Sequence, residues 1–326
     1  MAPSQHKLQQ AKGWHWHPEL PVALSPIFSW PPQPVATVKW IASYWFAISS
    51  VTILFVLAWA VFALLQPPLS EMRQLQLGWI AQIWARNICL MSAIAGGLHL
   101  WFYIIRAQGT ERKYDPRPLA RGNRKFWFSD QVWDNMFFTL VSGVTIWTGF
   151  EVGYFWAAAH QMVPLMVWQD NPLWFAGFFV LIPIWSSLHF YLIHRALHWQ
   201  PLYRLAHSLH HRNINIGPWS GISMHPVEHV MYFSSCLIHF ILPSHPLHLL
   251  FHLYLQGMHP AFSHSGYDGV ISRGRKQLQT GDFFHQLHHR YVNCNYGTVE
   301  MPWDRLFGTF HNGHSPGRQS SDDEAR

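Results

Sequence analysis

The sequence predicts an all-α integral membrane protein in which about four transmembrane helices carry a helical, histidine-rich cytoplasmic domain. Three observations predict this class. Apolar residues make up 49% of the 326 residues and charged residues only 12%, about half the charged share usual for a soluble protein. Four segments are long and apolar enough to cross a bilayer. Histidines number 24 against 16 acidic residues, and most of them follow the last apolar segment.

The four predicted spans contain enough residues for a membrane-crossing helix, which needs about 20 apolar residues. Pro67 and Pro68 end the first span, "WIASYWFAISSVTILFVLAWAVFALL". The second carries Arg86 near its start, where a long side chain can snorkel to the interface. The spans are residues 40–65, about 79–105, about 134–159 and about 173–193.

A fifth apolar stretch, residues 230–257, does not resemble a clean span. Pro243 and Pro246 interrupt it, and it carries His239, His245, His248 and His252. Broken backbone is tolerated at membrane depth only where protein or a cavity surrounds it. We therefore predict a helical hairpin that dips into the membrane or lies on it.

The distribution of lysine and arginine predicts the orientation. These residues gather before residue 40, between 106 and 132, and after 193, whereas the two remaining loops hold only Arg73. Cytoplasmic loops are rich in lysine and arginine, so both termini and the loop 106–132 are expected in the cytoplasm. The predicted plan is a cytoplasmic N-terminal arm 1–39, transmembrane helices within 40–193, a histidine-rich region 194–311 that includes the hairpin, and a disordered tail 312–326.

Charge and cysteine content exclude several classes of protein. The net charge is +6, but no compact Lys/Arg run accompanies it, which favours contact with anionic lipid over nucleic acid. The three scattered cysteines indicate no disulfide framework. The first 20 residues lack an apolar core followed by a cleavage site, so we expect no signal peptide.

Histidines recur at helical spacing in "HRALHWQPLYRLAHSLHH", residues 194–211, and in "HQLHH", residues 285–289. Helical residues four apart lie on one face, about 6 Å from each other. Neutral imidazole is the commonest metal ligand, so these clusters could supply four ligands apiece to two metal ions. Isolated histidines such as His99 and His160 are expected to be hydrogen-bonded or solvated. The eight clustered candidates are His194, His198, His207, His210, His211, His285, His288 and His289.

The order H-x-x-x-H, H-x-x-H-H and a distant H-x-x-H-H resembles the fatty acid hydroxylase and sterol desaturase superfamily of membrane di-iron enzymes. Three further segments are similar to family segments: "HPVEH" at 225, "HSGYDG" at 264 and "NYGTVEMPWDRLFGT" at 295. The resemblance covers about residues 185–311. The first three spans resemble the family only in being membrane helices.

The resemblance implies a di-metal site of two iron ions, with O2 as co-substrate and two electrons from a separate donor. It carries the ligand role to the eight clustered histidines and to His264, with His225 as a further candidate. His229 and His259 lie nearby without a firm match to a family ligand, so a ligand role and a structural role both stay open for them. Metal-bound histidines commonly donate their second N–H to a carboxylate or carbonyl. The candidates for this supporting role are Glu228, Asp268, Asp282 and Asp304.

The function expected from this resemblance is hydroxylation of a C–H bond in a lipid: a fatty acyl chain, an aminolipid such as ornithine lipid, or a sterol. The alternative is a desaturase or sterol methyl oxidase with the same di-iron centre. "HPEL" near the N-terminus lacks the rest of a haem-carrier motif, so electrons are expected from a ferredoxin or a cytochrome with its reductase. We expect a multi-pass protein of a bacterial inner membrane, or of the endoplasmic reticulum in a eukaryote.

Two other classes fit the sequence less well. A zinc-dependent membrane hydrolase would show an open metal site with a general base, but no H-E-x-x-H is present and histidines would be left over. A metal transporter would need polar residues along a path through the spans, and the spans offer few.

Overall fold

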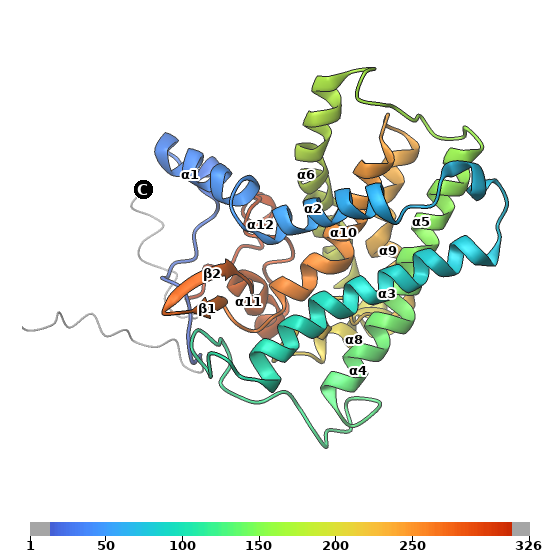
Figure 1. Ribbon diagram of the computed structural model, residues 1–326. Helices are drawn as coiled ribbons and strands as arrows, with labels where there is room; N and C mark the ends of the chain where they lie inside the picture. Colours follow the sequence, from blue (N-terminus) through green and yellow to red (C-terminus); the bar gives the residue numbers. More distant parts are fainter. Residues whose placement is uncertain (1–13, 315–326) are drawn as a thin grey trace, which may run out of the picture.

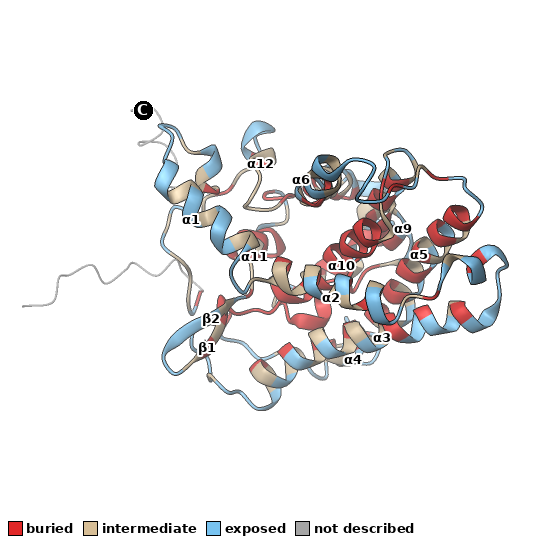
Figure 2. Cartoon of the chain, turned by 45° about the horizontal axis from the view of Figure 1, so that its top comes forward, coloured by how far each residue is buried: buried red, intermediate tan, exposed pale blue. Residues whose placement is uncertain are grey.

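The computed structural model describes residues 14–314, and its architecture is helical (Figure 1). Four helical segments are long and apolar enough to cross a membrane, which confirms the predicted all-α membrane class. Many residues of these segments are exposed (Figure 2). Large apolar side chains are among them, as lipid contact requires. The segments are Pro34–Leu64, Leu77–Ile104, Gln131–Ala159 and Pro172–Leu197.

Three of these segments are not uniform α-helices. The first consists of α1 (Pro34–Trp45) and α2 (Ser50–Leu64), and Ser49 caps α2 by accepting a hydrogen bond from the Thr52 amide. The second is α3 (Leu77–His99) followed by a π-helical turn, and the fourth is the continuous α6 (Pro172–Leu197). The third is α4 (Gln131–Phe137), a π-helical stretch and α5 (Val144–Ala159).

The helix α10 (Pro246–Ser263) lies at the centre of the fold and packs against α2, α3, α5 and α6. Almost all of its side chains are buried. At Gly257 a Cβ atom would lie 2.9 Å from the Trp147 ring, so a larger residue would push α10 away from α5. With α9 (Pro226–Phe233) and the 3₁₀ segment Ser234–Phe240, α10 forms a helical hairpin where the sequence predicts one.

Arg86 departs from the sequence prediction. It does not snorkel to the interface: it is 8% exposed and forms an ion pair with Glu151 of α5. Asn87 donates to the second Glu151 oxygen at 3.0 Å. The prediction was wrong because hydropathy alone does not reveal a buried carboxylate on a neighbouring helix, which compensates the guanidinium charge.

A short β-hairpin, β1 (Gly269–Ser272) and β2 (Arg275–Gln279), was not predicted. Arg273 and Gly274 form its turn with φ of 52° and 71°, the left-handed region that a tight hairpin turn needs. Four- and five-residue strands with mostly polar side chains carry too weak an alternation to be read from sequence.

The N-terminal arm packs against the C-terminal region. Trp14, Tyr114, Phe283 and Leu287 form a small second core. The His15 amide donates to the Tyr114 carbonyl at 2.9 Å. The amide of Val22 donates to the carbonyl of Asn312 at 2.8 Å. The arm 14–25, the loop that contains Tyr114 and the helix α11 (Phe283–Tyr291) are therefore held together.

Candidate metal centre

Four helical segments bring the clustered histidines to one place, near the C-terminal ends of α6 and α10. The last turn of α6 carries His194, and His198 caps it. A π-helical turn ends at His207 and leads into α8 (Ser208–His211). His264 directly follows α10, and α11 carries the remaining three, His285, His288 and His289.

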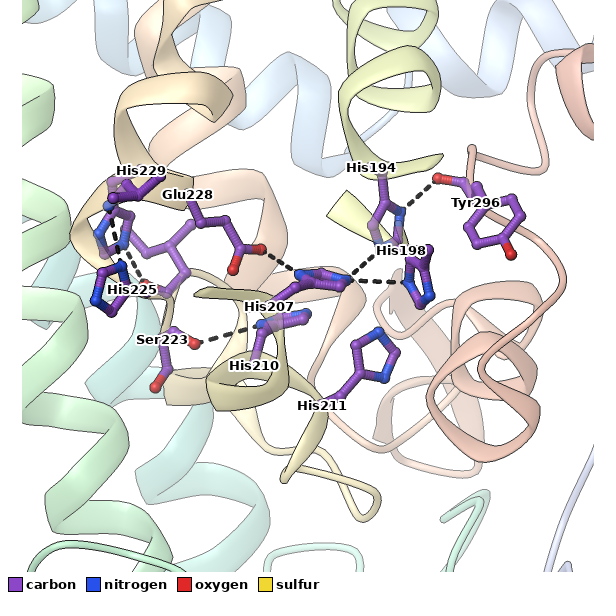
Figure 3. A network of polar contacts seen from close by, with 12 residues as sticks. His194, His198, His207, His210, His211, Ser223, His225, Glu228, His229 and Tyr296 are labelled. Atoms are coloured by element: carbon purple, nitrogen blue, oxygen red, sulfur yellow. Dashed lines mark hydrogen bonds and ion pairs between the residues drawn. The ribbon is translucent and has the colours of Figure 1, made fainter. Parts of the chain in front are cut away.

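The nine side chains form two groups. Within each group, one nitrogen per ring lies within 4.8 Å of the corresponding nitrogens of all the others. The eight clustered histidines divide into five and three, not four and four, and His264 brings the smaller group to four. The five-histidine group is His194, His198, His207, His211 and His288 (four of them labelled in Figure 3), and the four-histidine group is His210, His264, His285 and His289.

The spacing of the nitrogens suits metal ligands. In the four-histidine group, the Nε2 atoms of His264, His285 and His289 are 3.1–3.2 Å apart in all three pairs. In the five-histidine group, His207 Nε2 lies 3.1 Å from Nε2 of both His194 and His198. Two ligands at right angles, each about 2.1 Å from an ion, are about 3.0 Å apart.

In three of the rings, the nitrogen that faces away from the group is Nδ1, and it contacts a backbone carbonyl oxygen, which can only accept a hydrogen bond. The Nδ1–H groups of His194, His288 and His264 donate to the backbone carbonyls of Tyr296, Cys294 and Pro260 at 2.6, 2.6 and 3.0 Å. A neutral imidazole that donates through Nδ1 has only a lone pair at Nε2. These three rings therefore direct lone pairs into the groups, which is the tautomer that a metal ligand needs.

Burial keeps these rings neutral. Burial lowers the pKa of His198 and of His210 to about 4, and it lowers the pKa of His207 and of His288 well below the usual range. For all four rings burial is the largest cause, and the charge of nearby histidines or a backbone hydrogen bond changes the pKa less. Histidines at pH 7 are then unprotonated in both groups. The site is thus electrostatically suited to a cation.

The four carboxylates singled out from the sequence have different positions. Glu228 contacts a ring directly: its Oε1 atom lies 2.7 Å from His207 Nδ1 (Figure 3). Asp304 accepts from the amides of Tyr296 and Gly297 at 2.8 and 2.7 Å, and so fixes the carbonyl that binds His194. Asp282 caps α11. Asp268 contacts no ring of either group and pairs instead with Arg112 and Lys276.

The three other histidines that the sequence analysis considered near the motifs lie outside both groups. His225, the further ligand candidate, caps α9 by accepting from the Val227 amide at 3.2 Å. His229 contacts Ser142 and the Ile222 carbonyl. His259 lines a neighbouring cavity, and its buried Nδ1 has no hydrogen-bond partner among residues 14–314.

The cavity, of about 690 Å³, opens onto both groups. One face of α6 lines it from Pro183 to His194, a distance of about 16 Å along the helix. One face of α10 lines it from Gln256 to His264, and the break between α1 and α2 contributes Ala47 and Ile48. Sequence reasoning could not name the walls of this cavity, because they come from many segments that are distant in the sequence.

Comparisons with known proteins agree with the geometry. Residues 179–309 match the family model described as fatty acid hydroxylase. The chain is 31% identical over 135 residues to a Delta(7)-sterol 5(6)-desaturase of Eremothecium gossypii, which covers 41% of this chain and 37% of that protein. It is 34% identical over 121 residues to one from Saccharomyces cerevisiae, covering 37% and 32%. The chain thus spans about a third of the length of these curated relatives. No solved structure matches it.

Proposed function

We propose that this protein is a membrane-bound di-iron oxygenase that hydroxylates a C–H bond of a lipid. Its histidine-rich region matches the fatty acid hydroxylase model and is similar to sterol desaturases, which supports membership of this superfamily of oxidoreductases. In this proposal nine histidines hold two iron ions, five on one and four on the other. When bound, iron with O2 and two electrons supplies the oxidising power to remove hydrogen from an unactivated C–H bond.

The observation that carries the proposal is the set of facing lone pairs. His194, His264 and His288 each use their only N–H on a carbonyl. Their Nε2 atoms nevertheless lie 2.9–3.2 Å from Nε2 atoms of other rings. His207 also donates through Nδ1, to Glu228, so the facing Nε2 atoms of His194 and His207 both carry lone pairs, which repel one another unless a cation lies between them. The arrangement is therefore built to bind metal.

The ligand number favours iron over zinc. Imidazole suits iron, zinc and copper, but a structural zinc site is complete with four ligands. A group of five convergent histidines exceeds that number. The family membership of residues 179–309 supports the same choice.

The protein's own groups position the substrate and exclude water. Phe190, Ile193 and Leu197 lie on the α6 wall of the cavity beside His194, and Leu255 and Phe262 lie on the α10 wall. A volume of about 690 Å³ is that of a pocket for a small lipid or a lipid chain. This apolar space above the metal groups would hold a saturated carbon next to the site.

Electron supply and location complete the proposal. We propose that a separate ferredoxin, or a cytochrome with its reductase, delivers the electrons on the cytoplasmic side. The proposed location is the bacterial inner membrane, or the endoplasmic reticulum in a eukaryotic host. The lysine- and arginine-rich arm, loop and C-terminal region support the cytoplasmic orientation.

Desaturation is the second candidate reaction. Its support is specific: the relatives described above are named Delta(7)-sterol 5(6)-desaturases. The same site would serve both reactions, because removal of a second hydrogen atom in place of hydroxyl transfer gives a double bond.

Lipid mass spectrometry of cells with and without the protein, grown under labelled O2, tests the proposal. A lipid that gains one labelled oxygen atom establishes hydroxylation and identifies the substrate. A lipid that loses two hydrogens without label establishes desaturation. Purified protein that binds no iron and cells with an unchanged lipid profile, in a host that supplies the electron donor, would overturn the oxygenase assignment.

A further inference from the structure

One face of the third membrane segment carries a row of four polar side chains. They lie three or four residues apart, so the helical backbone brings them to the same side. All four form hydrogen bonds with residues 213–229, which run from the end of α8 into α9. Polar side chains within a membrane span are costly and commonly mark function. The four residues are Gln131, Asn135, Thr139 and Ser142.

Two of these residues hold Asn213, which lies two positions after the last histidine of α8. Gln131 Nε2 and Asn135 Nδ2 donate to Asn213 Oδ1 at 3.0 and 2.9 Å. All three amides are buried. Because the oxygen of Asn213 accepts from both partners, its NH2 group must face the other way. That group donates to the backbone carbonyl of His210 at 3.1 Å.

The surrounding backbone fixes the orientation of these amides. The Ala120 amide donates to Gln131 Oε1 at 2.9 Å, so Gln131 Nε2 is left as a donor. Gln131 Nε2 also donates to the Asn215 carbonyl at 2.7 Å. A side-chain amide turned by 180° would place its oxygen against that carbonyl and lose both bonds. The hydrogen bonds therefore run in one direction, from the loop before α4 to the His210 carbonyl.

This carbonyl belongs to the helical turn that serves both metal groups. His210 and His211 are neighbours at the end of α8, but His210 belongs to the four-histidine group and His211 to the five-histidine group. Consecutive residues of an α-helix point about 100° apart. The backbone amide of Asn213 donates to the same His210 carbonyl at 3.1 Å. A shift of this turn would therefore move one ligand in each group.

The residues on either side of Asn213 are also held. Arg212 forms an ion pair with the buried Asp134 of α4. On the other side, Gln286 of α11 donates to the Ile214 carbonyl at 2.9 Å. Residues 212–215 thus connect α4 with α8 and α11, the two helices that carry five of the nine histidines.

Building on the proposed metal centre, we propose that Gln131, Asn135 and Asn213 are positioning residues that set His210 and His211 in their separate metal groups. They act through the His210 carbonyl and the end of α8. The third membrane segment then contributes to the site, although it lies outside residues 179–309, which match the family model. Disturbing this amide triad should weaken metal binding by both groups together.

Titration with cobalt(II) tests this without turnover. Full-length metal-free protein in detergent is titrated, and visible absorption distinguishes the two groups because cobalt spectra depend on the number of ligands. N213A removes the link to His210 and should weaken cobalt binding at both groups by about tenfold or more, as is typical when a supporting group is lost. Thermal unfolding of the same samples verifies the fold.

T148V is the matched control for N213A. Thr148 is buried in the same membrane segment and accepts one hydrogen bond, but its partner is Asn87 of α3 and not a residue of 213–229. A residue with a merely structural role lowers the melting temperature and leaves the cobalt affinity of the folded protein unchanged. T148V should behave in this way.

N135L tests the path from α4 to His210 and carries the test alone if N213A does not fold. The bond to Asn213 is the one side-chain hydrogen bond of Asn135 within residues 14–314. N135L should weaken cobalt binding at both groups, but less than N213A does, because Gln131 still holds Asn213. In the N213A background the same change should cause no further loss. A further loss of equal size would overturn this path.

The outcomes keep this inference distinct from the proposed function. Folded N213A or N135L that binds cobalt at both groups as tightly as T148V would overturn the positioning role, while metal binding by the wild type would still support the metal centre. Weakening confined to one group would overturn the joint placement of His210 and His211. Wild-type protein that binds neither cobalt nor iron would overturn the metal centre and this inference with it.

Discussion

Removing the Glu228 carboxylate should weaken metal binding by the five-histidine group. Glu228 and His207 have side-chain exposures of 3% and 1%, and their contact is 2.7 Å. In E228A the His207 Nδ1–H would be buried without an acceptor, at a cost of about 1–3 kcal/mol. Loss of such a supporting group typically lowers metal affinity by about 10- to 100-fold. E228Q retains an acceptor oxygen without the charge, so its loss should be near the lower limit.

Chelator competition measures this loss. Protein loaded with iron or cobalt is titrated with a chelator, and the metal that remains is counted by mass spectrometry, while thermal unfolding verifies the fold. E111Q is the matched control, because Glu111 is exposed and contacts neither histidine group. If folded E228A held its metal as tightly as E111Q, the ring orientation at His207 would not depend on Glu228 and the reasoning would be refuted.

Three further predictions follow from the site and the spans. H210A should abolish lipid oxidation and lower the metal content, while the protein still accumulates in the membrane. H160A is the control: His160 is exposed after α5, so product formation in the same lipid assay should be unchanged. R86M should lower the free energy of unfolding by about 3–5 kcal/mol, because it leaves the Glu151 carboxylate buried without its ion-pair partner. The double variant R86M/E151L removes both charges, so thermal melts should show that it recovers part of that loss. Metal-free protein should lose stability as pH falls from about 6.5 to about 4. Burial lowers the folded pKa of His198 and of His210 to about 4, so in this range the folded protein binds fewer protons than the unfolded chain. Melting temperatures that stay level across this range would contradict the prediction.

Local patterns predicted the spans and the histidine clusters well. The fourth span was expected at about 173–193, and α6 covers Pro172–Leu197, because a bilayer-length apolar run has few alternative structures. Helical spacing also identified the eight clustered histidines, whose rings converge in the two groups. His264 required the family resemblance, since it is alone in its segment and no spacing rule distinguishes it from His259.

The features that sequence did not predict all depend on contacts between distant segments. The first span was expected to start at residue 40, but the helix begins at Pro34 and breaks between Trp45 and Ser50. Glu300 lies within the family-like segment that starts at Asn295, and it drew no attention because a single glutamate in a loop is usually solvated. It nevertheless lines the cavity that α6, α10 and the α1–α2 break enclose.

The contacts of the N-terminal arm bear on the topology independently of charge. His15 binds Tyr114, and Val22 binds Asn312, so three parts of the chain that are separated by membrane spans touch one another. Segments in direct contact outside the bilayer must lie in the same compartment. The number of crossings between them must then be even: two between the arm and Tyr114, and two more before Asn312. A reporter fused to the N-terminus would therefore reveal on which side of the membrane the histidine groups face.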